Sequence, residues 1–181
     1  MHRSMRLGVL VLVLTGTPAA LAGGQTWPRM VRETATAMPD SVRLRMLAMI
    51  AQGDISGAVE YYLLATGATT APRWLAAMQR AFDVVNRRAG PCQEVADDVL
   101  EGFKRLGQNP AYVRFANQLQ NNRYIGFEMT PGVPASTLQV STNASHVAVR
   151  VGERIYDAFT GPAGLVVKDY LARLINGRMV D

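Results

Sequence analysis

The sequence predicts an α+β fold in which a helical first half and a cysteine-bearing helix pack on a small antiparallel sheet. Two patterns along the chain support this fold class. Before residue 110, apolar residues recur at three- and four-residue steps between residues that start or end helices. After residue 110 the spacing changes to two, and the run SHVAVRVGERIYDAF at 145–159 is typical of two strands joined by a tight turn.

The first 22 residues have the three parts of an export signal. Arg3 and Arg6 give a positive start, residues 7–14 form an apolar core too short for an ordinary membrane anchor, and residues 20–22 match the small-x-small cleavage pattern. Cleavage after Ala22 would leave 159 of the 181 residues, enough for one domain with a hydrophobic core. No later stretch is apolar enough to span a bilayer, so we expect an exported bacterial protein, periplasmic or secreted, without a stable membrane anchor.

Three helices are expected before the cysteine. Asp40 and Asp54 are of the residue type that caps helix N-termini, and Pro72 suits a first helical turn because its φ is fixed near the helical value. Gly53 and Gly67 are expected to end the first two helices. The expected helices are residues 40–50, 55–65 and 73–87.

The only cysteine of the chain, Cys92, stands at the start of a fourth expected helix, in the segment GPCQEVADDVLEGFKRLG. Pro91 belongs in the first turn, and Gly107 ends the helix after residue 106. One face of this helix is apolar and consists of Cys92, Val95, Val99, Phe103 and Leu106.

Strands are expected in the second half of the chain. AYVRFANQL at 111–119 and RYIGFEM at 123–129 are candidates, and the segment 145–159 forms a hairpin around the two-residue turn Gly152-Glu153. The last expected elements are a loop and a short helix in residues 161–177, ended by Asn176-Gly177.

The hairpin turn fixes which residues share a face. If Gly152 and Glu153 form the turn, Ala148 faces Asp157 and His146 is the diagonal neighbour of Asp157, about 7 Å away at the backbone. The sequence therefore predicts a His146–Asp157 pair on one face, which we expect to be partly open. The other face is expected to be core: Val147, Val149, Val151 and Tyr156.

These residues suggest a nucleophile with its base. Cys92 needs a neighbouring base or cation to be a thiolate near neutral pH, and N–H groups at a helix start also favour the anion. His146 is the only histidine outside the signal, and Asp157 is suited to orient its ring. Each residue also has a structural interpretation: Cys92 as a small core residue, His146 as a packed ring, and Asp157 as the cap of the turn-rich loop DAFTGPAG. If Asp157 is only a cap, Asn143 and Glu128 are the next candidates for its role.

Composition argues against other classes of site. Loss of Arg3 and Arg6 with the signal lowers the net charge from +5 to +3, and no basic run is interleaved with aromatic residues, so nucleic acid is not an expected partner. One cysteine and one histidine are too few for an ordinary zinc site, and no phosphate-binding glycine-rich loop with its lysine is present, so no metal or other cofactor is expected.

The segments GPCQEVADDVLEGFKRLG and SHVAVRVGERIYDAFTGP resemble the papain-like cysteine peptidase superfamily, and most closely the papain-fold toxin domains of bacterial polymorphic toxin systems. The resemblance covers roughly residues 86–170. It implies Cys92 as nucleophile, His146 as base and acid, and Asp157 as the orienting residue. It also implies an amide side chain upstream of the cysteine in the oxyanion hole, for which Asn86 is the candidate, although the usual residue there is glutamine.

The resemblance implies an exported papain-like cysteine hydrolase of toxin type that acts on an amide, as a peptidase or a glutamine deamidase, with acyl transfer to an amine as a third outcome. Its partners would be a protein or peptide substrate, with an immunity protein as an optional partner. The expected organisation is a signal at 1–22, a helical region at 23–85 and a papain-like catalytic domain at 86–181. The alternative is a non-enzymatic exported protein of degenerate papain-like fold that binds a partner through Tyr61-Tyr62 and its methionine-rich helices.

Overall fold

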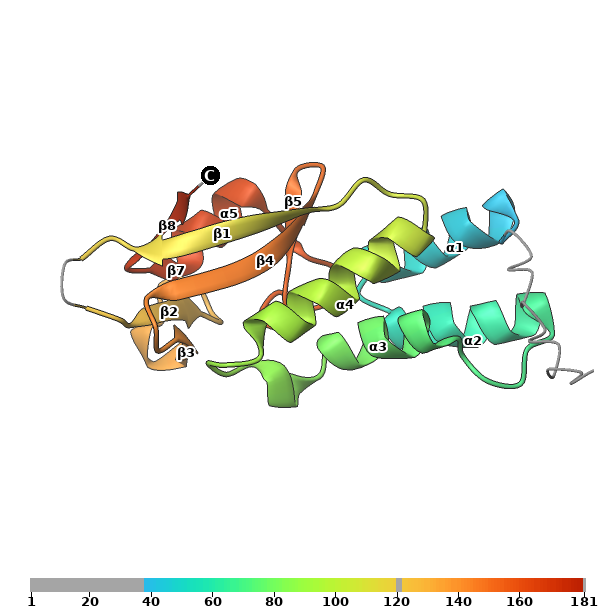
Figure 1. The fold of residues 1–181 in the computed structure, drawn as a ribbon, viewed down its shortest axis with the longest axis horizontal. Helices are drawn as coiled ribbons and strands as arrows, with labels where there is room; N and C mark the ends of the chain where they lie inside the picture. Colours follow the sequence, from blue (N-terminus) through green and yellow to red (C-terminus); the bar gives the residue numbers. More distant parts are fainter. Residues whose placement is uncertain (1–37, 120–121, 181) are drawn as a thin grey trace, which may run out of the picture. The chain divides into compact units, whose positions relative to one another are not determined.

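The computed structural model describes residues 38–119 and 122–180, and the predicted export signal lies outside these residues. The α+β prediction is confirmed, because helices fill the first half of the described chain and antiparallel strands the second (Figure 1). None of the helices in the described part of the chain is long and apolar enough to cross a membrane. The helices are α1 (Asp40–Ala51), α2 (Ile55–Thr66), α3 (Arg73–Ala81), α4 (Cys92–Arg105) and α5 (Val167–Arg173), with 3-10 turns η1 (Val84–Asn86) and η2 (Pro134–Ser136).

The start and end signals of the first two helices act largely as expected. The Asp54 carboxylate accepts a hydrogen bond from the Gly57 N–H at 2.8 Å and caps α2, and Gly67 ends it with a left-handed φ of 69°. The prediction that Asp40 caps α1 is wrong. Pro39 occupies the cap position, and Asp40 lies in the first turn, where it pairs with Arg43 at 3.0 Å.

Helix α3 is shorter than the expected 73–87, because it ends at Ala81 and is followed by the separate turn η1. The side-chain amide of Asn86 explains the early end. It donates to the Arg80 carbonyl at 2.9 Å and to the Ala81 carbonyl at 3.5 Å, so it replaces backbone donors that a continuing helix would supply. Helix α4 agrees with its prediction to one residue, with Pro91 at the cap position and Gly107 at a φ of 72°.

The strands form two antiparallel sheets. The larger has the order β6-β5-β4-β1-β8 and the smaller the order β3-β2-β7. Strands β3 and β6 to β8 are not predicted from the sequence, because they are short and lack a clear alternating pattern. The strands are β1 (Ala111–Asn117), β2 (Ile125–Glu128), β3 (Thr137–Ser141), β4 (Ser145–Val151), β5 (Arg154–Tyr156), β6 (Leu165–Val166), β7 (Leu174–Ile175) and β8 (Gly177–Val180).

The hairpin has the predicted register. Val151 pairs with Arg154 and Val149 with Tyr156, around the turn at Gly152 and Glu153. Gly152 has a φ of 57°, which a tight hairpin turn requires at its first central position. The ladder stops at Tyr156, so the pairs expected beyond it do not form and β5 is only three residues long.

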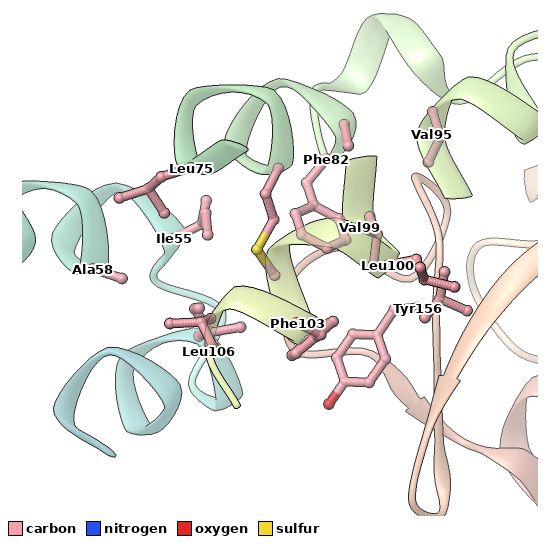
Figure 2. Close-up of a cluster of buried hydrophobic side chains, with 14 of the residues drawn as sticks. Ile55, Ala58, Leu75, Phe82, Val95, Val99, Leu100, Phe103, Leu106 and Tyr156 are labelled. Atoms are coloured by element: carbon pink, nitrogen blue, oxygen red, sulfur yellow. The ribbon is translucent and has the colours of Figure 1, made fainter. Parts of the chain in front are cut away.

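Strand β4 separates two apolar clusters. The first, here called the helical core, joins α1 to α4 to one face of β4 and β5, and Figure 2 shows part of it around Phe103 and Tyr156. The second, here called the sheet core, lies on the other face and includes Ala148. Its members are Val113, Phe115, Ile125, Phe127, Val140, Ala148, Ile155, Phe159, Tyr170 and Leu174.

The helical core contains residues from both sides of the expected domain boundary at 85/86. Leu75 and Met78 of α3 share it with Val99 and Phe103 of α4, and all four are almost fully buried. Gly102 of α4 allows close packing of these helices, since a Cβ there would collide with Met78. Helices α1 to α3 are therefore packed on the segment expected to be catalytic.

Candidate active site

Three of the predicted site residues, Cys92, His146 and Asp157, come together where β5 ends and leaves one edge of β4 unpaired. Strand β4 pairs with β1 along 145–150, but with β5 only along 149–151. Helix α4 packs on β4, and the backbone N–H of Val147 lowers the pKa of Cys92 at the start of that helix. His146 precedes Val147 in the strand, and Asp157 follows the last residue of β5. The short β5 thus gives α4 access to the histidine.

His146 and Asp157 form a buried pair. The imidazole Nε2 lies 3.0 Å from Asp157 Oδ2, and the two side chains are only 1% and 2% exposed. The ring packs between aromatic neighbours, with the Phe115 ring stacked at 6.0 Å and the Phe159 ring edge-on at 6.2 Å. Hydrogen bonding and packing together hold the imidazole in one orientation.

Asp157 receives four hydrogen-bond donors. Oδ1 accepts from the N–H groups of Phe159 and Thr160, both at 2.9 Å. Oδ2 accepts from Tyr170 Oη at 2.7 Å and meets His146 Nε2 at 3.0 Å. A carboxylate has about four acceptor positions, so this one is fully satisfied without water. Asp157 is therefore both the loop cap and the partner of His146, which were alternatives at the level of sequence.

Cys92 is the third member of the group. It is half-buried at the first position of α4. Because Nε2 is held by Asp157, Nδ1 is the imidazole nitrogen left for the thiol, and Nδ1 is buried without a hydrogen-bond partner among the described residues. The interaction with His146 is the largest influence on the thiol and lowers its pKa, while burial opposes it. The N–H groups of Val147 and Gln93 lower the pKa further, so the helix start acts on the sulfur as expected.

The electrostatics favour an imidazolium beside a thiolate. Burial alone would lower the pKa of His146, but its hydrogen bond to Asp157 and its interaction with Cys92 outweigh burial and raise that pKa to about 9. Burial would likewise raise the pKa of Asp157, yet the His146 and Tyr170 side chains hold it below its usual range. Both shifts favour a proton on His146 over one on Asp157, and the lowered pKa of Cys92 favours the thiolate beside it.

The expectation that the His–Asp face is partly open is wrong. That face packs into the sheet core, and solvent reaches the group only beside Cys92, the one member that is not fully buried. The sequence pattern misled because polar residues on one face of a hairpin usually indicate an exposed face. Here the polar atoms satisfy one another instead, which removes the need for water.

Asn86 is not joined to the other predicted residues by any hydrogen bond in the described chain. Its amide binds the end of α3, and it lines a hollow of about 230 Å³ together with Pro91, Glu94 and Asp98. Its role in an oxyanion hole stays a prediction. The backbone N–H groups of Gln93 and Val147, which lower the pKa of the thiol, are alternative donors beside the reacting atom.

The two reserve candidates for the role of Asp157 are bound elsewhere. Asn143 Oδ1 accepts from Ser141 Oγ and the Ser145 N–H, and Glu128 Oε2 accepts from the Gly132 N–H. Sequence reasoning missed Tyr170, because a tyrosine on the apolar side of a short helix has the pattern of an ordinary core residue.

No cluster of three or more metal-binding side chains occurs within residues 38–119 and 122–180. Comparisons of the chain with protein-family models, with curated proteins and with solved structures found no match.

Proposed function

We propose that this protein is a cysteine hydrolase that cleaves an amide bond, with Cys92 as nucleophile, His146 as base and acid, and Asp157 as the orienting residue. The observation that carries the proposal is the buried hydrogen bond between His146 and Asp157 beside the half-buried Cys92, whose pKa His146 lowers. A buried histidine between a carboxylate and a half-buried thiol at a helix start is the arrangement that thiol nucleophiles use.

The reaction follows from the resting ion pair. The Cys92 thiolate attacks the amide carbonyl carbon, and the carbon–oxygen π electrons move to the oxygen, where backbone N–H groups at the start of α4 can stabilise them. His146 gives its Nδ1 proton to the departing nitrogen as the carbon–nitrogen bond breaks. A water molecule then loses a proton to Nδ1 and attacks the thioester, and the thiolate leaves.

The similarity of the two motifs to papain-fold toxin domains supports a toxin-type peptidase or glutamine deamidase, exported through the signal at 1–22. These activities share the same steps and differ only in which nitrogen departs. A leaving peptide amine would make the protein a peptidase, whereas leaving ammonia would make it a deamidase.

The test is acylation of the protein by p-nitrophenyl acetate. We expect a burst of p-nitrophenolate equal to the concentration of protein, with the acetyl group found on Cys92 by mass spectrometry. Cys92→Ser should abolish the burst and His146→Ala should slow it by two orders of magnitude or more, on the scale of triad enzymes. Acetylation of wild-type Cys92 at the rate of an unperturbed thiol would refute the proposal and favour the partner-binding alternative.

Dimethylated casein then separates the activities. New amino termini would identify a peptidase, whereas ammonia without new amino termini would identify a deamidase. Cys92→Ser is the control for both readouts.

A further inference from the structure

We propose that Tyr170 is a positioning residue of this site, which fixes the Asp157 carboxylate and weakens its hold on the imidazolium proton of His146. This inference rests on the proposed function and extends it to α5, a part of the chain that the two sequence motifs do not explain.

The first support is geometric. The Tyr170 hydroxyl donates to Asp157 Oδ2 at 2.7 Å, and the same oxygen meets His146 Nε2 at 3.0 Å. Two donors therefore share one carboxylate oxygen. Each donor withdraws negative charge from that oxygen, so each weakens the bond that the other makes.

The second support is packing. Tyr170 is fully buried, and its ring contacts Phe115 and Phe127 with centroid distances of 5.1 Å in both cases. Phe115 also stacks on the His146 ring, so one aromatic side chain contacts both the imidazole and the phenol. The aromatic stack fixes both partners of Asp157 relative to each other, which is what a positioning role requires.

The third support is the small number of titratable groups that interact with His146 and Tyr170. Cys92 of α4 and Asp157 are the titratable groups that act on His146, and the same two act on Tyr170. Burial and the Asp157 carboxylate raise the pKa of Tyr170 well above its usual value, so the hydroxyl keeps its proton and remains a donor throughout the working range.

The role has a consequence for the reaction. An imidazolium held too strongly by Asp157 would be a poor acid toward the departing nitrogen, and one held too weakly would not persist beside the thiolate. The Tyr170 hydroxyl sets the balance between these extremes without touching the substrate.

The experiment is a pH titration of the His146 imidazole by 15N NMR in the full chain. His2 and His146 are the only histidines, so a His146→Ala spectrum assigns the signals. Tyr170→Phe keeps the ring and removes the hydroxyl. We expect it to raise the pKa of the imidazolium by about half to one pH unit, because Asp157 then holds the proton with one competitor fewer.

Tyr156→Phe is the matched control. It also removes a hydroxyl from a buried tyrosine, but Tyr156 packs on Phe103 in the helical core, and no hydrogen bond in the described chain joins it to Asp157. It should leave the titration unchanged. Introducing 3-fluorotyrosine at residue 170 strengthens the donor with little change in size, and should shift the pKa downward. This opposite sign tests the proposal even if Tyr170→Phe does not fold.

Two results would overturn the inference in distinguishable ways. If wild-type His146 titrates near 6.5 and Cys92 reacts with iodoacetamide as an ordinary thiol, the proposed function fails and the inference fails with it. If wild type shows the ion pair but Tyr170→Phe and Tyr156→Phe titrate identically, the proposed function stands and Tyr170 has only a packing role.

Discussion

Replacing Asp157 by asparagine should leave the fold intact and reverse the hydrogen bonding of His146. The amide keeps Oδ1, so it can still accept from the N–H groups of Phe159 and Thr160. The amide Nδ2 replaces Oδ2, however, and its two N–H donors then face His146 Nε2 and Tyr170 Oη. The tyrosine hydroxyl can rotate and accept, but the imidazole must give up its Nε2 proton. The proton on Nδ1 then points at Cys92, and the neutral ring has no free lone pair with which to accept the thiol proton.

The size of the loss follows from the pKa of His146. That pKa lies at about 9, whereas the usual value is 6.5, and the difference of roughly 2.5 units corresponds to about 300-fold in favour of the charged ring. Cys92 supplies part of this stabilisation and remains in the variant. We therefore expect Asp157→Asn to lower the acylation rate by about 100-fold near pH 7.5.

The assay compares the p-nitrophenyl acetate burst with the thermal unfolding of each variant. Asp157→Ala is the matched partner, because it loses the loop cap as well as the carboxylate and should unfold at lower temperature than Asp157→Asn. An Asp157→Asn protein that acylates at the wild-type rate per folded molecule would refute the reasoning and leave Asp157 as a loop cap alone.

Three further changes test the electrostatics and the packing. In wild type, a rise in pH from about 6.5 to 9 removes the stability that comes from the raised pKa of His146 and adds the stability that comes from the lowered pKa of Cys92. Cys92→Ala abolishes the Cys92 contribution, so urea unfolding of this variant should show its stability falling by roughly 2 kcal/mol over this pH range. A flat profile would contradict the ion pair. Asn86→Ala should lower the free energy of unfolding by about 1 kcal/mol, since it removes a hydrogen bond at the end of α3, and should change the acylation rate little. A large loss of rate without destabilisation would instead support a role for Asn86 in the oxyanion hole. Gly102→Ala should lower the denaturant midpoint of unfolding, because overpacking against Met78 costs about 1–3 kcal/mol and exceeds the gain in helix propensity from alanine. Equal or higher stability of the variant would show that α3 can move away.

The hairpin and the His146–Asp157 pair could be predicted from sequence because both depend on local rules. A two-residue turn fixes the register, and the period of two assigns the faces, so two residues eleven positions apart can be paired without any knowledge of the rest of the chain. The same rules gave the limits of α4 from Pro91 and Gly107.

The remaining features depend on contacts between distant segments. The burial of His146 and Asp157 requires Phe115 from β1 and Tyr170 from α5, and no local sequence pattern predicts either contact. The early end of α3 depends on one side-chain amide of Asn86, whose competition with the backbone is not visible in apolar spacing. Strands of two to five residues, such as β3 and β7, are set by their neighbours and not by their own sequences.

The two-residue turn at Gly152 and Glu153 makes the site more sensitive to insertions and deletions than to many substitutions. One added residue in the turn would change the register by one, and every side chain of the second arm would move to the opposite face. Asp157 would then point toward the helical core, which contains no histidine. Among descendants of this chain, the length of the turn should therefore vary less than its composition, and an alignment gap at this point would mark a copy that has lost its carboxylate–imidazole pair.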